Sequence, residues 1–171
     1  MGKAKFTEYA VKRAIPFSAT LIWEILDDTK HFGENDPYHT DMQFLTEQKK
    51  GVGTKIRMKH FYRPIFWFNP DYVTCTITRR EPQKLLTLVE ANEKTNWKSH
   101  VQEFILEPTG PSSTLVKFNV SYRVIPLAFL PLRLWARWLS QKRMADKLKE
   151  IEEACKKWTK ENEGHLSILH E

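Results

Sequence analysis

The feature that most constrains this chain is one long stretch that can form a single helix. After Pro131 no proline or glycine occurs until Gly164, and a proline is tolerated in the first helical turn because its missing N–H has no partner there. A helix over residues 131–162 would be roughly 48 Å long at about 1.5 Å per residue. Because a small domain is narrower than that, we expect one end of the helix to extend beyond the rest of the fold or to line an opening.

The two halves of this stretch, residues 124–162, differ in their surfaces. Residues 124–139 are apolar on nearly every side, whereas the second half is polar apart from one stripe that contains Leu148, Ile151, Cys155 and Trp158. The stripe predicts that the second half packs one face against a core. The first half must bury or present its apolar surface in some other way.

The residues before the helix predict strands with one helical interruption. Residues 3–15 alternate between apolar and polar side chains, which is typical of a half-buried strand, and Pro16 ends it. Ser18 is a suitable N-cap for a short helix up to residue 28, and residues 29–34 can form a second short helix or turn. Six strands then follow at the spacing of an antiparallel meander, at residues 39–47, 54–62, 71–80, 85–91, 97–107 and 114–124. This order predicts an α+β fold in a single domain over residues 1–162, with a loosely ordered tail at 163–171.

The connections between these strands fall into two groups, because alternate hairpins of a meander turn at the same end of the sheet. Connections 49–53, 81–84 and 108–113 are polar, whereas connections 63–70, 92–96 and 125–131 bring many apolar side chains to the other end. A large apolar cluster predicts a ligand mouth, a partner site or a membrane contact. The alternative is that the aromatic loop packs onto the apolar helix start, so that each buries the other. The predicted mouth contains Phe66, Trp67, Phe68, Phe129, Leu132 and Trp135.

The order of elements resembles the helix-grip fold of the START/SRPBCC superfamily, which includes polyketide cyclase/dehydrase-like, coenzyme Q-binding-like and birch-pollen-allergen-like proteins. The resemblance rests on R-A-I-P-F-S-A-T-L-I-W-E-I-L-D-D at 13–28, G-V-G-T at 51–54, I-T-R-R-E-P-Q-K-L-L at 77–86, F-I-L-E-P at 104–108 and the long final helix. It implies a curved antiparallel sheet of about seven strands around the C-terminal helix, with a cavity for hydrophobic small molecules between them. The chain departs from the pattern at H-F-G-E-N-D-P, which lacks a tryptophan, and in the aromatic insertion at 66–68.

Strand alternation assigns side chains to the inner face of the sheet. It predicts a mostly apolar interior with a few polar groups, lined by Met58, His60, Tyr62, Cys75, His100, Gln102, Phe118, Tyr122, Leu134 and Trp138. His60 and His100 are the candidate acid or base groups of an enzyme, since imidazole titrates near neutral pH. Glu90 and Glu103 are predicted to point away from this interior.

Several function classes have no support in the sequence. The patterns HExxH, GxSxG and the P-loop are absent, and we predict neither a metal site nor a cofactor. The two cysteines, Cys75 and Cys155, have no paired spacing and suit a reducing compartment. Together with the lack of a signal-peptide pattern, this predicts a cytoplasmic protein. The net charge of +6 comes without a nucleic-acid-binding motif, which argues against that class of partner.

The sequence therefore favours a non-catalytic binder, and possible carrier, of a hydrophobic small molecule such as a lipid, isoprenoid or polyketide. One alternative is a cyclase/dehydratase-like enzyme that uses His60 or His100, and another is a protein-interaction module that uses the apolar end. The helix start also has the aromatic and basic composition of an interfacial helix, so a peripheral contact with a membrane is a further prediction; the alternatives for this segment are a cavity lid or a dimer contact. This prediction rests on Arg133, Arg137, Lys142 and Arg143 beside the apolar residues.

Overall fold

The computed structural model describes residues 6–28, 39–60, 71–94, 99–123 and 130–168. Its elements are β1 (Phe6–Ile15), α1 (Ala19–Asp27), β2 (His39–Phe44), β3 (Lys55–His60), β4 (Asp71–Glu81), β5 (Leu85–Asn92), β6 (His100–Gly110), β7 (Ser113–Arg123) and α3 (Leu130–Ile168). These elements confirm the predicted order of strand, short helix, six strands and long helix. The second short helix predicted at 29–34 lies outside the described residues.

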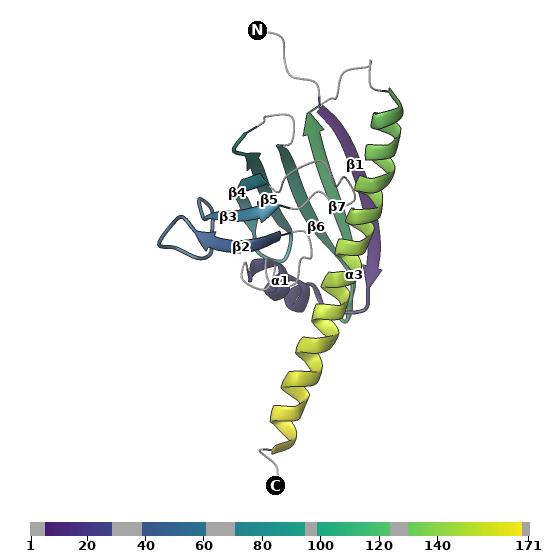
Figure 1. Cartoon of the computed structure of the whole chain (residues 1–171). Coiled ribbons are helices and arrows are strands. Elements are labelled where there is room, and N and C mark those ends of the chain that lie inside the picture. The colour runs from purple at the N-terminus through teal and green to yellow at the C-terminus, as the bar shows by residue number, and fades with distance from the viewer. Residues whose placement is uncertain (1–5, 29–38, 61–70, 95–98, 124–129, 169–171) are drawn as a thin grey trace.

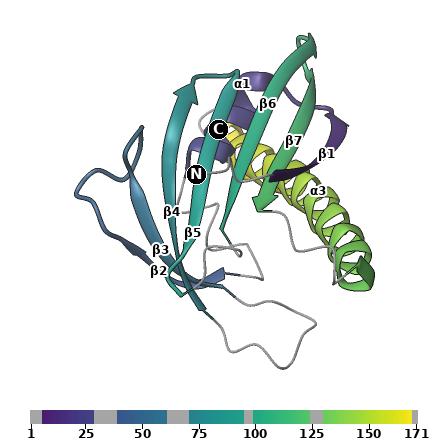
Figure 2. The same cartoon turned by 90° about the horizontal axis from the view of Figure 1, so that it is seen from above.

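The strands form one antiparallel sheet of seven strands in the order β1-β7-β6-β5-β4-β3-β2. The strands β2 to β7 follow one another as a meander over residues 39–123, and β1 pairs with β7, the last strand of the chain. Figures 1 and 2 show the sheet curving around the side on which α3 lies, with α3 beside β1 and β7. The predicted helix-grip architecture is confirmed.

The hairpin between β2 and β3 shows why its two glycines are needed. Gly51 and Gly53 have φ angles of 97° and 90°, a conformation that costs a residue with a Cβ energy but suits glycine. The backbone N–H of Gly53 donates to the carbonyl of Ile77 at 2.8 Å. This bond ties the turn to β4 and helps fix the register of the sheet.

The helix α1 covers one end of the sheet (Figure 1). The hydroxyl of Ser18 accepts a hydrogen bond from the backbone N–H of Leu21, which confirms the predicted N-cap. At the other end of the helix, the buried carboxylate of Asp27 accepts two hydrogen bonds from Arg80, at 2.7 and 2.8 Å. The Arg80 guanidinium also lies 5.4 Å from the Trp23 ring, so one side chain of β4 holds α1 in place.

Two predictions about α3 need correction. The stripe of Leu148, Ile151 and Cys155 is buried as predicted, but Trp158 is 41% exposed because the last turns of α3 extend past the sheet (Figure 1). The helix also continues beyond residue 162 to Ile168. A single glycine at position 164 costs a helix only about 1 kcal/mol, so it does not end the helix here.

Candidate functional site

A group of polar side chains lies on the inner face of the sheet near the ends of β5 and β7 and the starts of β2 and β6. The register pairs Glu90 of β5 with His100 of β6, and His100 with Tyr122 of β7. Residues directly opposite on neighbouring antiparallel strands point to the same face, so these three side chains form one row across the sheet. We call this group, with two further members described below, the Glu90 cluster: His39, Glu90, His100, Gln102 and Tyr122.

Glu90 is the residue that the sequence placed wrongly. It was predicted to point outward, but its residue surface is only 1% exposed. The reason is that β5 begins with two adjacent buried leucines, Leu85 and Leu86, and the inner face of the strand follows the second one through Leu88 to Glu90. The prediction that Glu103 points outward agrees with its hydrogen bond from Asn119 on β7, at 3.3 Å, and its partial exposure.

Three nitrogen atoms converge on one carboxyl oxygen of Glu90. The Oε2 atom accepts a hydrogen bond from the Gln102 amide at 3.3 Å and lies 3.4 Å from Nε2 of His100. The same amide nitrogen lies 2.8 Å from Nε2 of His100. The Nε2 atom of His39 is 3.7 Å from the same oxygen. Imidazole side chains in general can donate and accept protons near neutral pH, and a carboxyl group beside them can hold the rings in place.

The position of His39 depends on the curvature of the sheet. Its strand, β2, is the third strand away from β5 in the sheet, and three strand spacings would separate them by roughly 14 Å in a flat sheet. The 3.7 Å distance between His39 and Glu90 shows that the sheet bends β2 toward β5. No alternation pattern along β2 indicates this contact.

Tyr122 connects the cluster to α3. Its ring lies 4.9 Å from the His100 ring and 5.8 Å from the Tyr9 ring, and a hydrogen bond joins its hydroxyl to that of Ser140. Burial raises the pKa of Tyr122, and the hydrogen bond to Ser140 opposes that effect. Because its pKa lies above its ordinary value of 10, Tyr122 keeps its proton at neutral pH.

Apolar side chains surround the Glu90 cluster. Met58, Cys75 and Phe118 are buried on the same inner face, and the rings of Phe104 and Phe118 stack with their centroids 4.2 Å apart. Cys75 lies directly opposite Glu90 on β4. Burial, with a smaller contribution from the charge of Glu90, raises the pKa of the Cys75 thiol, which makes it a poor nucleophile at neutral pH.

Comparisons with known proteins identify the fold. No protein-family model matches the chain, and no curated protein matches its sequence. Among solved structures, norcoclaurine synthase from Thalictrum flavum has a TM-score of 0.70 at 14% identity, covering 93% of this chain and 99% of that one. An aromatase/cyclase from Streptomyces sp. R1128 has a TM-score of 0.68 at 11% identity, covering 89% of this chain and 94% of that one. A START superfamily protein from Mycobacterium smegmatis has a TM-score of 0.67 at 14% identity, covering 88% of this chain and 98% of that one. At these identities the likeness shows the fold, and the chain has the helix-grip fold of these three structures.

Within this helix-grip sheet, the predicted site residues have different positions. Five of them lie on the inner face as predicted: Met58, Cys75, His100, Phe118 and Tyr122. Gln102 joins them through its hydrogen bond to Glu90. The side chains of His60 and Leu132, and residues Tyr62, Phe66, Trp67, Phe68 and Phe129, lie outside the described part of the structure.

Two predicted lining residues on α3 do not lie in the interior of the helix-grip fold. Leu134 is 61% exposed and Trp138 is 59% exposed. Among the α3 side chains that the structure describes, the first fully buried one is Met144, so apolar character before that residue does not by itself place a side chain inside. Trp135, predicted at the mouth, is partly buried.

The described residues contain no group of three or more His, Cys, Asp or Glu side chains arranged to hold a metal ion. Within the same residues, no helix combines the length and apolar character needed to cross a membrane. The Glu90 cluster itself offers hydrogen-bonding groups inside an apolar surface.

Proposed function

We propose that this protein binds a hydrophobic small molecule on the inner face of its sheet, with the polar end of the ligand at the Glu90 cluster. The observation that carries the proposal is the carboxyl group of Glu90, 1% exposed, with two imidazoles and an amide directed at one of its oxygens. Burying such groups costs several kcal/mol unless they have polar partners. A few converging polar groups in an apolar surface are typical of small-molecule sites.

The binding energy would come mainly from removing the apolar part of the ligand from water. Hydrogen bonds from His100, Gln102 or Tyr122 would then fix its orientation. The thiols of Cys75 and Cys155 are both free and buried, which suits a reducing compartment such as the cytoplasm. Lipids, isoprenoids and polyketides remain the ligand classes that fit this description.

A second candidate function is acid–base catalysis on a polyketide-type substrate, as in a cyclase or dehydratase. The observation that favours it is the 3.4 Å distance between Glu90 and His100, because a carboxylate beside an imidazole can hold the ring in place while it transfers a proton. An aromatase/cyclase shares this fold. That likeness supports the candidate through the fold, and the catalytic step would rest on His100.

The first test is native mass spectrometry of the purified protein, followed by organic extraction and identification of any bound compound. We expect a hydrophobic passenger at one molecule per chain. A protein mass without any passenger would contradict stable ligand binding. It would favour an enzyme with a transient substrate, or the protein-interaction module.

Substitution of His100 separates the binder from the enzyme. In a binder, His100→Gln should weaken affinity for the extracted compound by roughly tenfold, because one hydrogen bond to a polar group is lost. In an enzyme, the same change should lower turnover of a polyketide-type substrate by about 10²- to 10⁴-fold. The matched control is Glu103→Gln, on the outer face of the same strand, which should leave both measurements unchanged. Absence of turnover in the wild-type protein would rule out the second candidate.

A further inference from the structure

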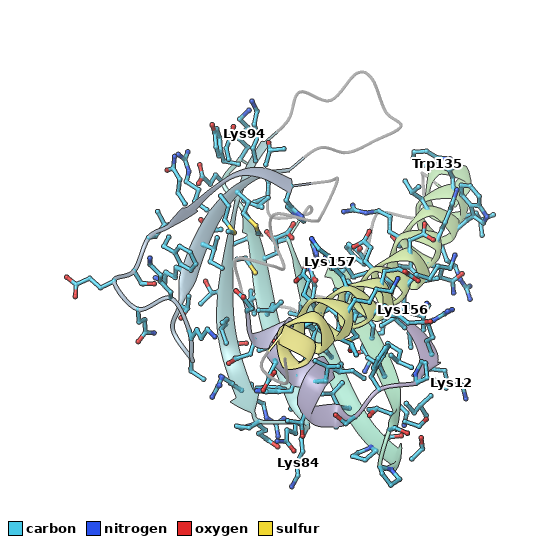
Figure 3. All side chains as sticks on the ribbon, turned by 90° about the horizontal axis from the view of Figure 1, so that it is seen from below. Lys12, Lys84, Lys94, Trp135, Lys156 and Lys157 are labelled. Atoms are coloured by element: carbon cyan, nitrogen blue, oxygen red, sulfur yellow. The ribbon has the colours of Figure 1, made fainter. Side chains whose placement is uncertain are left out.

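The first turns of α3 present apolar side chains to solvent. Leu134 and Trp138 are the most exposed large apolar residues of the described structure, at 61% and 59%, and they lie one turn apart on the same face of the helix. Arg137 and Lys142 are also exposed, and the Lys142 ammonium lies 5.6 Å from the centre of the Trp138 ring. We call these four residues the α3 start surface. In Figure 3 the neighbouring Trp135 lies near one end of α3, and Lys156 and Lys157 lie further along the helix toward its other end.

The charge of this segment has a single sign. Residues 130–145 contain no Asp or Glu and four basic residues, Arg133, Arg137, Lys142 and Arg143. Further along α3, acidic and basic side chains alternate and pair, as Lys157 and Glu161 do at 3.9 Å near Trp158. Exposed tryptophans therefore occur in two settings on one helix, and only the first is uniformly basic.

We propose that the α3 start surface docks on the surface of an anionic lipid bilayer. Tryptophan prefers the headgroup level of a bilayer, and long basic side chains can cover apolar surface with their stems while their charges reach lipid phosphates. A protein partner fits less well, because lysine is depleted from the cores of protein interfaces, and here Lys142 lies over the central tryptophan. The match between a basic segment that contains no acidic residue of its own and negatively charged lipid decides the choice of partner.

The opposite side of the same part of α3 contacts the Glu90 cluster, since two residues along an α-helix are about 200° apart. Ser140, two residues after Trp138, is hydrogen-bonded to Tyr122, and the ring of Tyr122 is 4.9 Å from that of His100. A protein docked in this way would hold its polar cluster close to the lipid from which a hydrophobic ligand could come. This last link rests on the proposed function, whereas docking itself follows from the exposed residues and their charge.

Co-sedimentation of the full chain with lipid vesicles tests the docking. The vesicles are phosphatidylcholine alone, or phosphatidylcholine with about a quarter of phosphatidylserine to give a negative surface potential. We expect binding to the anionic vesicles only. Trp138→Ala should weaken it at least about tenfold, because a buried aromatic side chain is lost. Trp158→Ala is the matched control, since it removes an exposed tryptophan from the same helix, and should leave vesicle binding unchanged.

The charges can be tested separately. Arg137→Gln and Lys142→Gln should each weaken binding roughly fivefold, and raising the salt concentration should weaken wild-type binding, since surface charges are screened over about 8 Å at physiological ionic strength. Lys157→Gln serves as the control and should have no effect. Circular dichroism of each variant checks that α3 is intact.

Three results would overturn the proposal. The first is an equal loss of vesicle binding in Trp138→Ala and Trp158→Ala. The second is equal binding of the wild-type protein to neutral and anionic vesicles. The third is no vesicle binding by a protein that light scattering shows to be a dimer and that Trp138→Ala converts to a monomer. The last result would assign the α3 start surface to a second copy of the chain. Glu90→Gln should keep wild-type vesicle binding, so that failure of the docking and failure of the proposed ligand site give different results.

Discussion

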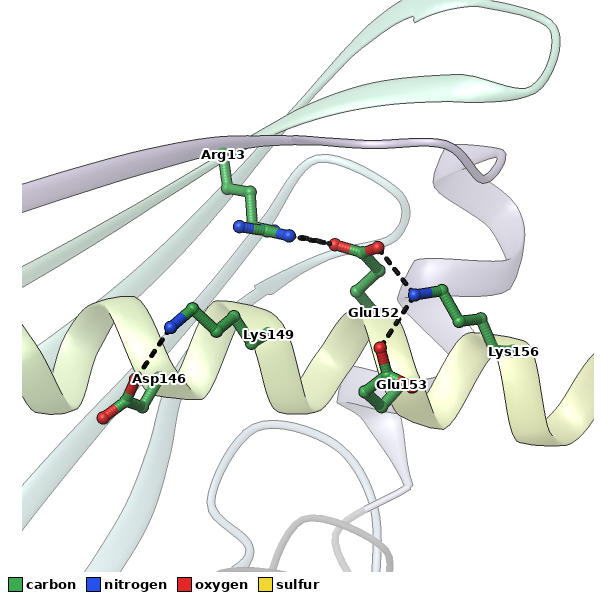
Figure 4. A network of polar contacts seen from close by, with 6 residues as sticks. All are labelled: Arg13, Asp146, Lys149, Glu152, Glu153 and Lys156. Carbon is green, nitrogen blue, oxygen red and sulfur yellow. Dashed lines mark hydrogen bonds and ion pairs between the residues drawn. The ribbon is translucent and has the colours of Figure 1, made fainter.

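Two buried carboxylates in this protein have very different partners. Glu152 of α3 is 8% exposed and lies 2.7 Å from Arg13 of β1 and 2.9 Å from Lys156, as Figure 4 shows. Glu90 of β5 is 1% exposed, and the closest of its described partners are an amide and an imidazole at 3.3 and 3.4 Å. The first carboxylate faces groups that are charged at all ordinary pH values, whereas the second faces a neutral amide and two imidazoles, which can change protonation.

This difference indicates different roles. The pKa of Glu152 is lowered most by its hydrogen bond from Lys156 and next by its hydrogen bond from Arg13. The carboxylate therefore stays ionised and ties α3 to β1 at all ordinary pH values. A tie of this kind is structural. Histidine near a carboxyl group instead keeps proton transfer available, which is of use at a site that meets a ligand and of little use in a structural tie.

Of the substitutions that test this difference between the two carboxylates, Glu90→Gln should have the largest effect. The amide keeps the size of the side chain and its hydrogen-bonding capacity but removes the acid. We expect ligand retention, measured by native mass spectrometry, to fall by tenfold or more, equivalent to about 1.4 kcal/mol. The free energy of unfolding in urea should change by less than about 1 kcal/mol. A variant that retains its ligand fully but unfolds more easily would make Glu90 a structural residue like Glu152.

Most of the fold follows from local patterns in the sequence. The alternation of β7 assigns Val116, Phe118 and Val120 to the core, and the stripe of α3 assigns Leu148 and Ile151 to it. All five are buried. These assignments succeed because each depends only on the period of one element.

The candidate site was harder to predict, for physical reasons that differ between residues. Glu90 was misplaced because either of the two leucines that begin β5 could have set the inner face, although counting from Leu86 would have found it. His39 reaches Glu90 through the curvature of the whole sheet, which no local pattern records. Trp138 was assigned to the interior because apolar character does not tell which part of a long helix meets the core.

The second prediction concerns Glu152→Gln, which should lower the free energy of unfolding by about 1 kcal/mol near neutral pH, because a charge-assisted hydrogen bond is weakened. The pKa of Glu152 in the folded protein is below its ordinary value of 4.5. The stabilisation is therefore present above about pH 4.5 and is lost as the pH falls through the lower, folded pKa. Urea unfolding curves of wild type and variant should diverge at neutral pH and converge in acid. A constant difference across this range would show that the charge of Glu152 does not matter.

The smallest expected effect isolates a single ion pair of the structural carboxylate. A double-mutant cycle with Arg13→Gln and Glu152→Gln should give a coupling energy of about 0.5 kcal/mol, since the Arg13 side chain is 41% exposed and water screens the pair. The control cycle uses Lys149→Gln and Asp146→Asn, an exposed pair within α3 at 3.2 Å (Figure 4), which should couple by no more than about 0.3 kcal/mol. High salt should reduce both couplings. A larger coupling in the control pair would mean that joining α3 to β1 adds nothing to the Arg13–Glu152 interaction, and the contrast between the two carboxylates would then rest on Glu90 alone.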